Sequence, residues 1–400
     1  MSTLTAGTRI RAPRVPAYPL VVMLLAVALG VSGAPAPLYG IYAREWHLAP
    51  ITTTVVFAVY AVGALAAVLV AGVLSDRLGR KPLLLGAVLA MAAGLVVFMT
   101  AHGVAALVVA RALHGIAVGT AVVVGGAALL DLRPEHGARS GQLTGITFNI
   151  GMAITILGAA LLAQYVPDPL VTPYAAVGLV VLVMLLALLG LPETHQNRST
   201  APVRIARPAV PDHIRADFRF AVLGVMASWA VLGVYLSLFP AFAGVSTHIH
   251  SLVFGGIVVA AMAGAAAVSQ AVGGGLVPRH AAVIGDLGTA AALLFGLVAL
   301  HTHHATAVLL AAVLMGLMFG LAFGGSLRHL GGVVPADRRG EVMSAYYLLA
   351  YGAMAVPTVL AGWAATTWGL AAVFPWFTLA VALACVAAGL LGMLAPRRAV

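Results

Sequence analysis

Long apolar runs follow one another along almost the whole chain, and each is long enough to cross a lipid bilayer. A transmembrane helix needs roughly 20 mostly apolar residues. Only 8% of the 400 residues are charged, whereas a soluble protein carries about 25%. So little charge cannot cover a surface that faces water, and the apolar residues must therefore face lipid. The sequence predicts a polytopic membrane protein.

Twelve spans are predicted, and all must be helices, because backbone polar groups in lipid need partners within the same segment. The first run follows Arg9, Arg11 and Arg14 and continues past Ala36, so it is interpreted as a span and not as a cleaved leader. The predicted spans are 19–41, 52–74, 82–101, 104–130, 141–165, 170–191, 218–243, 250–276, 281–300, 305–329, 340–364 and 369–395.

The basic residues indicate the orientation, because cytoplasmic loops are enriched in Lys and Arg. With the N-terminus in the cytoplasm, 19 of the 21 basic residues fall in cytoplasmic segments, while Arg44 lies outside and Arg111 lies within a span. One missed or extra span would distribute the basic residues over both sides of the membrane. We expect a multi-pass protein of the cell inner membrane with both termini in the cytoplasm.

The chain divides into two related halves. The longest polar segment, 192–217, contains four prolines and is predicted to be a cytoplasmic linker between six-helix bundles formed by 1–191 and 218–400. Similar residues recur at offsets of 199 to 201: Gly126 and Gly325, Pro134 and Pro335, Arg139 and Arg339, Gly151 and Gly352. Such repeats are typical of transporters that bind solute between the repeats, near the bilayer midplane.

One short loop carries the strongest local pattern, Gly72-Val-Leu-Ser-Asp76-Arg77-Leu-Gly79-Arg80-Lys81. It is a glycine-rich turn with one acid among three cations. The acid can accept hydrogen bonds from a helix N-terminus, and the cations can pair with acids at other helix ends. Such a clasp would hold the halves together on the cytoplasmic side. The alternative is an ordinary basic loop that follows from the topology.

This loop resembles the signature between the second and third spans of the major facilitator superfamily, and it matches at every position. Span number, half repeat, linker and the run Pro192-Glu193-Thr194 extend the resemblance along the chain. The resemblance implies an all-α membrane protein with twelve transmembrane helices in two pseudo-symmetric six-helix bundles, similar to drug/proton antiporter-like sugar or multidrug efflux members. It also implies that Asp76 caps the eleventh helix and that Arg80 bridges to an acid ending helix four. The implied conformational gate comprises Gly72, Asp76, Arg77, Gly79, Arg80 and Asp131.

Span four contains an arginine at membrane depth. Inserting Arg111 costs roughly 2.5–3.5 kcal/mol, so it should face a cavity or a partner. His114 is expected on the same helix face, and Gly115 and Gly119 allow another helix to approach closely. The pair is interpreted as a site for an anionic group or for proton coupling. The alternative is an arginine bonded to neighbouring carbonyls, with the histidine as packing. The pattern is similar to the superfamily motif Arg-x-x-Gln-Gly, which is linked to proton coupling, with histidine in place of glutamine.

Few other candidate solute contacts lie within the spans. In the resembling fold, helices 1, 4, 7 and 10 line the central cavity, which favours Ser32, Arg111, His114, Trp229 and Tyr235. The candidate substrate-binding residues are Ser32, Arg111, His114, Asn149, Trp229, Tyr235, Tyr347 and Tyr351. The alternative interpretation of these aromatic residues is that they pack in the core or form a belt at the membrane interface. Span five has no proline between 141 and 165, which departs from the drug-antiporter signature.

Acids and histidines complete the set of titratable groups. Every acid is predicted to lie in a loop or near a helix end, and Asp286 is the closest to an exception. A permanently cationic solute would need a carboxylate at mid-membrane depth, so we expect a neutral, anionic or zwitterionic solute. Histidines gather in two outside loops, at His248, His250, His301, His303 and His304. Such tracts can bind metal, but no cysteine or carboxylate completes a ligand set nearby. Neither a metal site nor a cofactor is predicted.

The leading hypothesis is a secondary transporter that exports a small organic solute in exchange for protons. The sequence has no Gly-x-x-x-x-Gly-Lys loop for ATP and no nucleophile–base constellation, so no enzyme is predicted. Its basic residues form no patch interleaved with aromatics, so no nucleic acid is expected. The expected partners are the lipid bilayer, a small-molecule substrate and protons, and the expected state is a monomer. An uptake transporter, and a non-transporting sensor that reads pH or metal through the outside histidines, remain alternatives.

Overall fold

The structure is a computed structural model that describes residues 16–195, 207–249, 251–335 and 338–394. Within these ranges twelve helices are long and apolar enough to cross a membrane, and no strand occurs. The predicted all-α fold with twelve spans is therefore confirmed.

The spans form two groups in chain order. The first group consists of α1 (Ala17–Gly33), η1 (Ala36–Leu38), α2 (Tyr39–Glu45), α3 (Pro50–Leu78), α4 (Arg80–Met99), α5 (Val104–Leu132), η2 (Pro134–His136), α6 (Gly137–Tyr165) and α7 (Thr172–Leu189). The second consists of η3 (Asp212–Ile214), α8 (Arg215–Ser237), α9 (Phe239–Thr247), α10 (Leu252–Val272), η4 (Gly273–Gly275), α11 (Pro278–His301), α12 (Ala305–Val333), α13 (Arg339–Trp368) and α14 (Leu370–Leu394).

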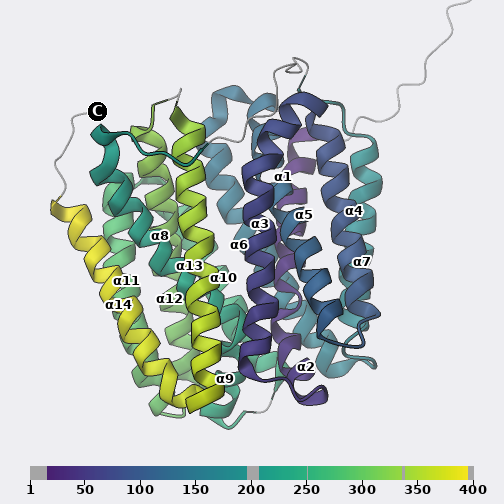
Figure 1. Cartoon of the computed structure of the whole chain (residues 1–400), viewed down its shortest axis with the longest axis vertical. Coiled ribbons are helices and arrows are strands. Elements are labelled where there is room, and N and C mark those ends of the chain that lie inside the picture. The colour runs from purple at the N-terminus through teal and green to yellow at the C-terminus, as the bar shows by residue number, and fades with distance from the viewer. Residues whose placement is uncertain (1–15, 196–206, 250, 336–337, 395–400) are drawn as a thin grey trace, which may run out of the picture.

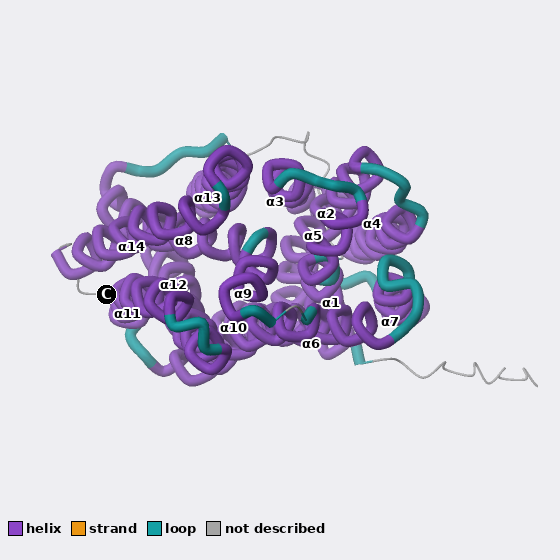
Figure 2. The backbone as a smooth tube through the Cα atoms, turned by 90° about the horizontal axis from the view of Figure 1, so that it is seen from below, coloured by secondary structure: helices purple, strands orange, loops and turns teal. Residues whose placement is uncertain are grey.

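The two groups stand side by side as two bundles. Figure 1 shows the spans running roughly parallel to one another, and Figure 2 shows α1–α7 on one side and α8–α14 on the other. The bundles meet mainly where α3 lies beside α13 and α6 lies beside α10 (Figure 2). A solute that passes between the bundles must therefore pass between these two helix pairs.

The two ends of the bundles are named here by their loops. The linker end, at the top of Figure 1, carries the turn between α3 and α4 and residues 192–195 after α7. The opposite end carries α2, α9 and the turn between α11 and α12.

Prolines interrupt two of the spans. The first span breaks after Gly33 and continues through η1, as Pro35 and Pro37 predict. The seventh was predicted as one run over 218–243, which is wrong: α8 ends at Ser237 and α9 restarts at Phe239. The reason is Pro240, which has no N–H for the helix ladder and is tolerated only in the first turn.

Glycines bring helices of the first bundle into backbone contact. A methyl group on Gly115 or Gly119 of α5 would collide with the backbone carbonyls of Tyr60 and Ala64 on α3. Gly151 of α6 presses in the same way on the carbonyl of Ala26 in α1. The helix predicted to approach Gly115 and Gly119 is therefore α3, and close packing of small residues replaces a hydrophobic driving force between helices in lipid.

Candidate functional site

Arg111 lies inside the first bundle, in a cage of aromatic rings. Only 1% of the residue is exposed. Its Nη1 donates to the backbone carbonyl of Ser32 at 2.9 Å, and its guanidinium lies 4.6 Å from the ring centre of Tyr60, 5.3 Å from Phe57 and 5.9 Å from Tyr39. The rings and the carbonyl stabilise the cation without an acid. This is the geometry of the alternative interpretation, in which arginine bonds to carbonyls of a neighbouring helix.

His114 faces a different neighbour. Its ring lies 5.3 Å from that of Phe98 on α4, and a methyl group on Gly94 of α4 would collide with it. The side chain is fully buried. Arg111 therefore contacts α1, α2 and α3, whereas His114 contacts α4, and the two candidates do not face one common cavity.

Aromatic candidates of the second bundle form one cluster. The rings of Trp229 on α8 and Tyr351 on α13 meet edge to face at 4.8 Å. Tyr347 lies 6.4 Å from Tyr351, and Phe323 of α12 lies 5.8 Å from Trp229. Three of the four residues were predicted as solute contacts, and the structure brings them together.

Asn149 and Tyr235 lie on opposite bundles around a small void. They line a cavity of about 10 Å³ together with Met152, Leu232 and Phe319. That volume holds about one water molecule. The Asn149 amide donates to the carbonyl of Gly145 at 2.9 Å, and Tyr235 stacks on Phe239 at 4.1 Å. The void between these two residues is too small for an organic solute.

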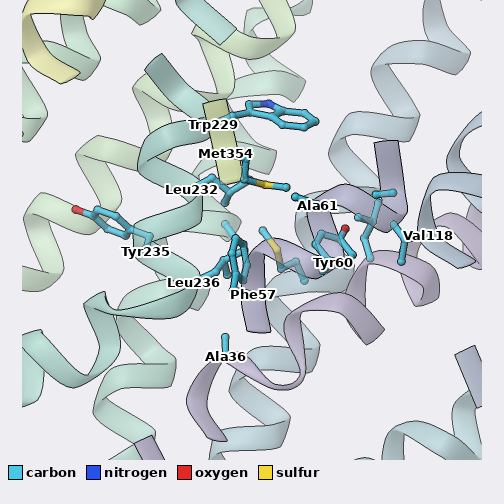
Figure 3. Close-up of a cluster of buried hydrophobic side chains, with 14 of the residues drawn as sticks. Ala36, Phe57, Tyr60, Ala61, Val118, Trp229, Leu232, Tyr235, Leu236 and Met354 are labelled. Carbon is cyan, nitrogen blue, oxygen red and sulfur yellow. The ribbon is translucent and has the colours of Figure 1, made fainter. Parts of the chain in front are cut away.

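Apolar side chains close the interface at this depth. Figure 3 shows Phe57 and Tyr60 of α3 facing Leu232, Leu236 and Met354 of the second bundle. The same two rings hold Arg111. The arginine therefore lies behind an aromatic wall and does not line the interface.

A large cavity opens at the linker end between the two bundles. Its volume is about 810 Å³, which is within the range of small-molecule sites. Gln142 of α6 lines it from the first bundle, while Gln270, Phe323 and Arg339 line it from the second. Gln270 is buried and its Nε2 has no hydrogen-bond partner in the described structure. Among the described lining residues none is acidic.

The opposite end is held closed by two contacts between the bundles. The Ile51 amide of α3 donates to Thr366 Oγ1 of α13 at 3.0 Å. Ser251, which caps α10, donates to Gln164 Oε1 of α6 at 2.7 Å. The bundles also touch at the linker end, where Gln142 Nε2 of α6 donates to the carbonyl of Gln270 of α10 at 2.9 Å. The larger of the two cavities between the bundles nevertheless lies at the linker end, since the one at the opposite end holds about 370 Å³.

Arg80 joins three segments of the first bundle at the linker end. Its Nε donates to Asp131 at the end of α5 at 3.0 Å, and its Nη1 contacts Asp76 at 2.6 Å and also bonds to Ser75. Gly79 has φ 102°, and a methyl group there would collide with Glu193. The turn therefore requires glycine at this position. Gly72 lies within α3, and Arg77 is exposed in its last turn.

The outside histidines form a pair. The rings of His248 and His303 lie 5.5 Å apart, and His301 Nδ1 lies 2.7 Å from the carbonyl of Leu297. His304 precedes α12, and His250 lies outside the described residues. In the part of the chain that the structure describes, no group of three or more His, Cys, Asp or Glu side chains is placed to hold a metal ion.

Comparison with protein families decides the class of this fold. The model of the Major Facilitator Superfamily matches residues 20–356, which is most of the chain. The chain belongs to the major facilitator superfamily. It is therefore a multi-pass membrane transporter, and the resemblance of the loop after α3 to the superfamily signature reflects membership.

Curated relatives match only part of the chain. The multidrug resistance protein MdtL of Klebsiella pneumoniae subsp. pneumoniae is 33% identical over 157 residues, which cover 38% of each chain. MdtL of Salmonella dublin is 31% identical over 155 residues, or 38% of this chain and 37% of MdtL. The chain thus spans about two fifths of the length of these relatives.

A solved superfamily structure has the same fold. The human organic anion transporter MFSD10 (TETRAN) superposes with a TM-score of 0.67 over 96% of this chain and 100% of its own. The two sequences are 18% identical, so the similarity concerns the fold alone.

One gate residue differs from the superfamily expectation. Arg80 bridges to Asp131 as predicted, but Asp76 pairs with Arg80 and does not cap the eleventh span. The N-cap residue of α13 is Arg338, without a side-chain cap bond. The open cavity explains the difference, since Arg339 and Met343 at the start of α13 line it and face space rather than the first bundle.

The role of Glu193 was not predicted from the sequence. Its carboxylate accepts hydrogen bonds from the backbone N–H groups of Arg80 at 2.8 Å and Lys81 at 3.2 Å, which open α4. Glu193 therefore caps a helix that is distant in sequence, in place of the missing local cap. The run Pro192-Glu193-Thr194 had pointed to the superfamily but not to this contact.

Asp286 corrects the prediction that every acid lies near a helix end. It is the ninth residue of α11, which places it about 12 Å from the start of the helix. The residue is 0% exposed, and neither carboxylate oxygen has a hydrogen-bond partner in the described structure. The early start of α11 at Pro278, three residues before the predicted span, puts Asp286 deeper than expected.

Proposed function

We propose that this superfamily member exports a small organic solute by alternating access, in exchange for protons. The observation that carries the proposal is the cavity of about 810 Å³ between the bundles at the linker end, which exceeds the cavity of about 370 Å³ between them at the opposite end. Transporters with repeated halves work by rocking the halves around a site between them. The names of the MdtL relatives support the outward direction.

We place the linker end in the cytoplasm of a cell with the protein in its inner membrane. Basic residues gather at that end, at Arg77, Arg80, Lys81, Arg133, Arg215, Arg279, Arg328, Arg338 and Arg339. Cytoplasmic loops carry this excess of cations. The cavity then opens to the cytoplasm, where an exporter collects its solute.

The lining of the cavity favours an anionic, zwitterionic or neutral solute. Arg339 is exposed to the cavity, and the unpartnered Gln270 amide adds a hydrogen-bond donor. Phe323 and Met343 supply apolar surface. A buried donor gains most from an acceptor on the solute, because leaving it unpaired costs about 1–3 kcal/mol.

The predicted midplane contacts have distinct parts in this proposal. Trp229, Tyr347 and Tyr351 adjoin the cavity through Phe323 and would receive the solute as it moves inward. Asn149 and Tyr235 would line the path once the small void between them widens. Ser32, Arg111 and His114 lie behind the aromatic wall, where they act on the conformation or on protons rather than on the solute.

Transport assays in proteoliposomes test the proposal. In vesicles that expose the linker end outward, an acidic vesicle interior, from which protons flow out, should drive accumulation of an organic anion or zwitterion found by a thermal-shift screen. Arg339→Gln should weaken uptake, whereas Arg338→Gln should not, because Arg338 pairs with Glu341 and is not among the cavity residues. Binding without any flux would overturn the transport function, and flux that ignores the pH gradient would overturn proton coupling.

A further inference from the structure

Asp286 is the one fully buried carboxylate of the described chain that has no bonded partner. The other buried acid, Asp217 of α8, bonds to His329 of α12 at 2.9 Å. A lone ionised carboxylate in an apolar interior is so costly that the group binds a proton or a partner instead. Ionisable residues at membrane depth are rare and mark ion or proton pathways.

The surroundings of Asp286 are small and uncharged. Gly224 of α8 leaves space for the carboxylate, since a methyl group there would lie 2.8 Å from both oxygens. Tyr346 of α13 and Cys385 of α14 lie close enough to interact electrostatically with Asp286. The hydroxyl groups of Tyr346 and Thr289 also lack partners in the described structure. A neutral carboxylic acid has a donor to offer such groups, whereas a carboxylate has none.

The charged groups on the helices around Asp286 are engaged elsewhere. Asp217 and His329 bond to each other, Arg328 of α12 donates to the carbonyls of Gly273 and Gly274, and Arg279 of α11 donates to the carbonyl of Gly392. The other titratable groups near these helix ends, Arg219, His280 and His301, are exposed. α9, which also packs on α11, has none. Among the residues that the structure describes, no cation therefore balances Asp286 in this conformation.

We propose that Asp286 is the group that binds and releases the proton exchanged for solute, an inference that rests on the proposed function. Its position suits release at the linker end. Val283, one turn before Asp286 on α11, lines a second cavity of about 920 Å³ there, and Met343, one turn before Tyr346 on α13, lines the cavity between the bundles. A movement of about one helical turn would bring water to the carboxyl group. The protonated form of Asp286 favours the buried position of this structure. The ionised form favours the conformation in which water reaches the carboxyl group.

Infrared difference spectroscopy tests proton binding without transport. The full-length protein in lipid nanodiscs should show the C=O band of a protonated carboxyl group, shifted in D2O and lost on raising the pH. Asp286→Asn should remove this band, and Asp286→Glu should keep it at a shifted frequency. Asp217→Asn is the matched control and should leave the band unchanged. A band that persists in Asp286→Asn, or its absence from the wild-type protein, would overturn the assignment.

Proteoliposome flux then tests coupling. Asp286→Asn should reduce gradient-driven accumulation to background, because the amide can neither bind nor release the exchanged proton. Unchanged accumulation in Asp286→Asn would overturn the inference. If the wild-type protein moves no solute, the proposed function fails, and the infrared result still decides whether Asp286 holds a proton.

Discussion

Arg111 shows how a single residue at membrane depth is stabilised without a counter-ion. The rings of Tyr39, Phe57 and Tyr60 and the Ser32 carbonyl surround its guanidinium. Each buried cation–π contact contributes up to about 2 kcal/mol, and a hydrogen bond to a charged group about 1.5–3 kcal/mol. Together these contacts offset the cost of placing the charge in the span.

Replacing Arg111 should therefore destabilise the first bundle. We expect Arg111→Ala to lower the free energy of unfolding by about 2–4 kcal/mol, from lost packing and cation–π energy. Thermal unfolding in one detergent measures the effect. Arg133→Ala is the matched control, because Arg133 lies 4.7 Å from the ring centre of Tyr18 but is exposed, and it should cost less than about 1 kcal/mol. Equal losses in both variants would contradict this account.

Glu193 predicts a pH dependence at the linker end. Burial raises the pKa of this carboxyl group, but hydrogen bonds from the backbone N–H groups of His195, Arg80 and Lys81 outweigh it, so the pKa lies below its ordinary value of 4.5. The stabilisation is complete above the ordinary value and is lost as the pH falls through the lowered one.

Glu193→Gln should lower stability at neutral pH by about 0.5–2 kcal/mol, the usual value of a helix cap. The difference from the wild-type protein should shrink as the pH is lowered below the ordinary pKa of glutamate, because the wild-type cap is then protonated. Melting curves at neutral and acidic pH measure it. Glu341→Gln, which breaks an exposed pair with Arg338, should have little effect at either pH. If the stability difference between Glu193→Gln and the wild-type protein widened at acidic pH, Glu193 could not be acting as a helix cap.

At the scale of helices, packing depends on where glycines meet a neighbouring backbone. Within α6, Gly151 presses on the carbonyl of Ala26, whereas no atom lies within 4 Å of the space beside Gly158. The two glycines lie two turns apart on one helix, so they share the same helix propensity and differ in their contacts.

Gly151→Ala should destabilise the protein by about 1–3 kcal/mol, because α1 must move away from the added methyl group. Gly158→Ala should be neutral or stabilising by up to about 1 kcal/mol, from better helix propensity. Thermal unfolding of the two single variants compares them directly. Similar melting temperatures would mean that α1 and α6 adjust freely.

At the scale of the whole molecule, the end opposite the linker should have to open for transport to occur. Gly362 of α13 lies directly against the side chain of Thr54 on α3. Cysteines at both positions should form a disulfide that locks this end closed, abolishing flux under oxidation and restoring it under reduction. Each single cysteine variant is the control, since the native Cys385 is buried. Flux that survives complete crosslinking would rule out rocking of the two bundles.

Sequence patterns predict most of this architecture and only part of the site. Run length and loop charge define twelve spans, since hydropathy and backbone bonding act locally. Trp229 was predicted as a solute contact from its helix, and Tyr347 and Tyr351 from their polar groups at membrane depth, but the contact between these rings was not predicted. The caged Arg111, the cap at Glu193 and the depth of Asp286 depend on which helix faces which, and spacing along one helix does not determine that.

The charge of Arg111, which is held without an acid, should also make the protein sensitive to voltage. No carboxylate in the described structure neutralises it, so the first bundle carries a fixed positive charge at membrane depth. Moving one elementary charge across a membrane potential is worth about 2.3 kcal/mol per 100 mV. If rocking shifts the bundle along the membrane normal, an interior-negative potential favours whichever conformation carries Arg111 inward. The balance of conformations in a living cell then differs from that in detergent, where no field acts.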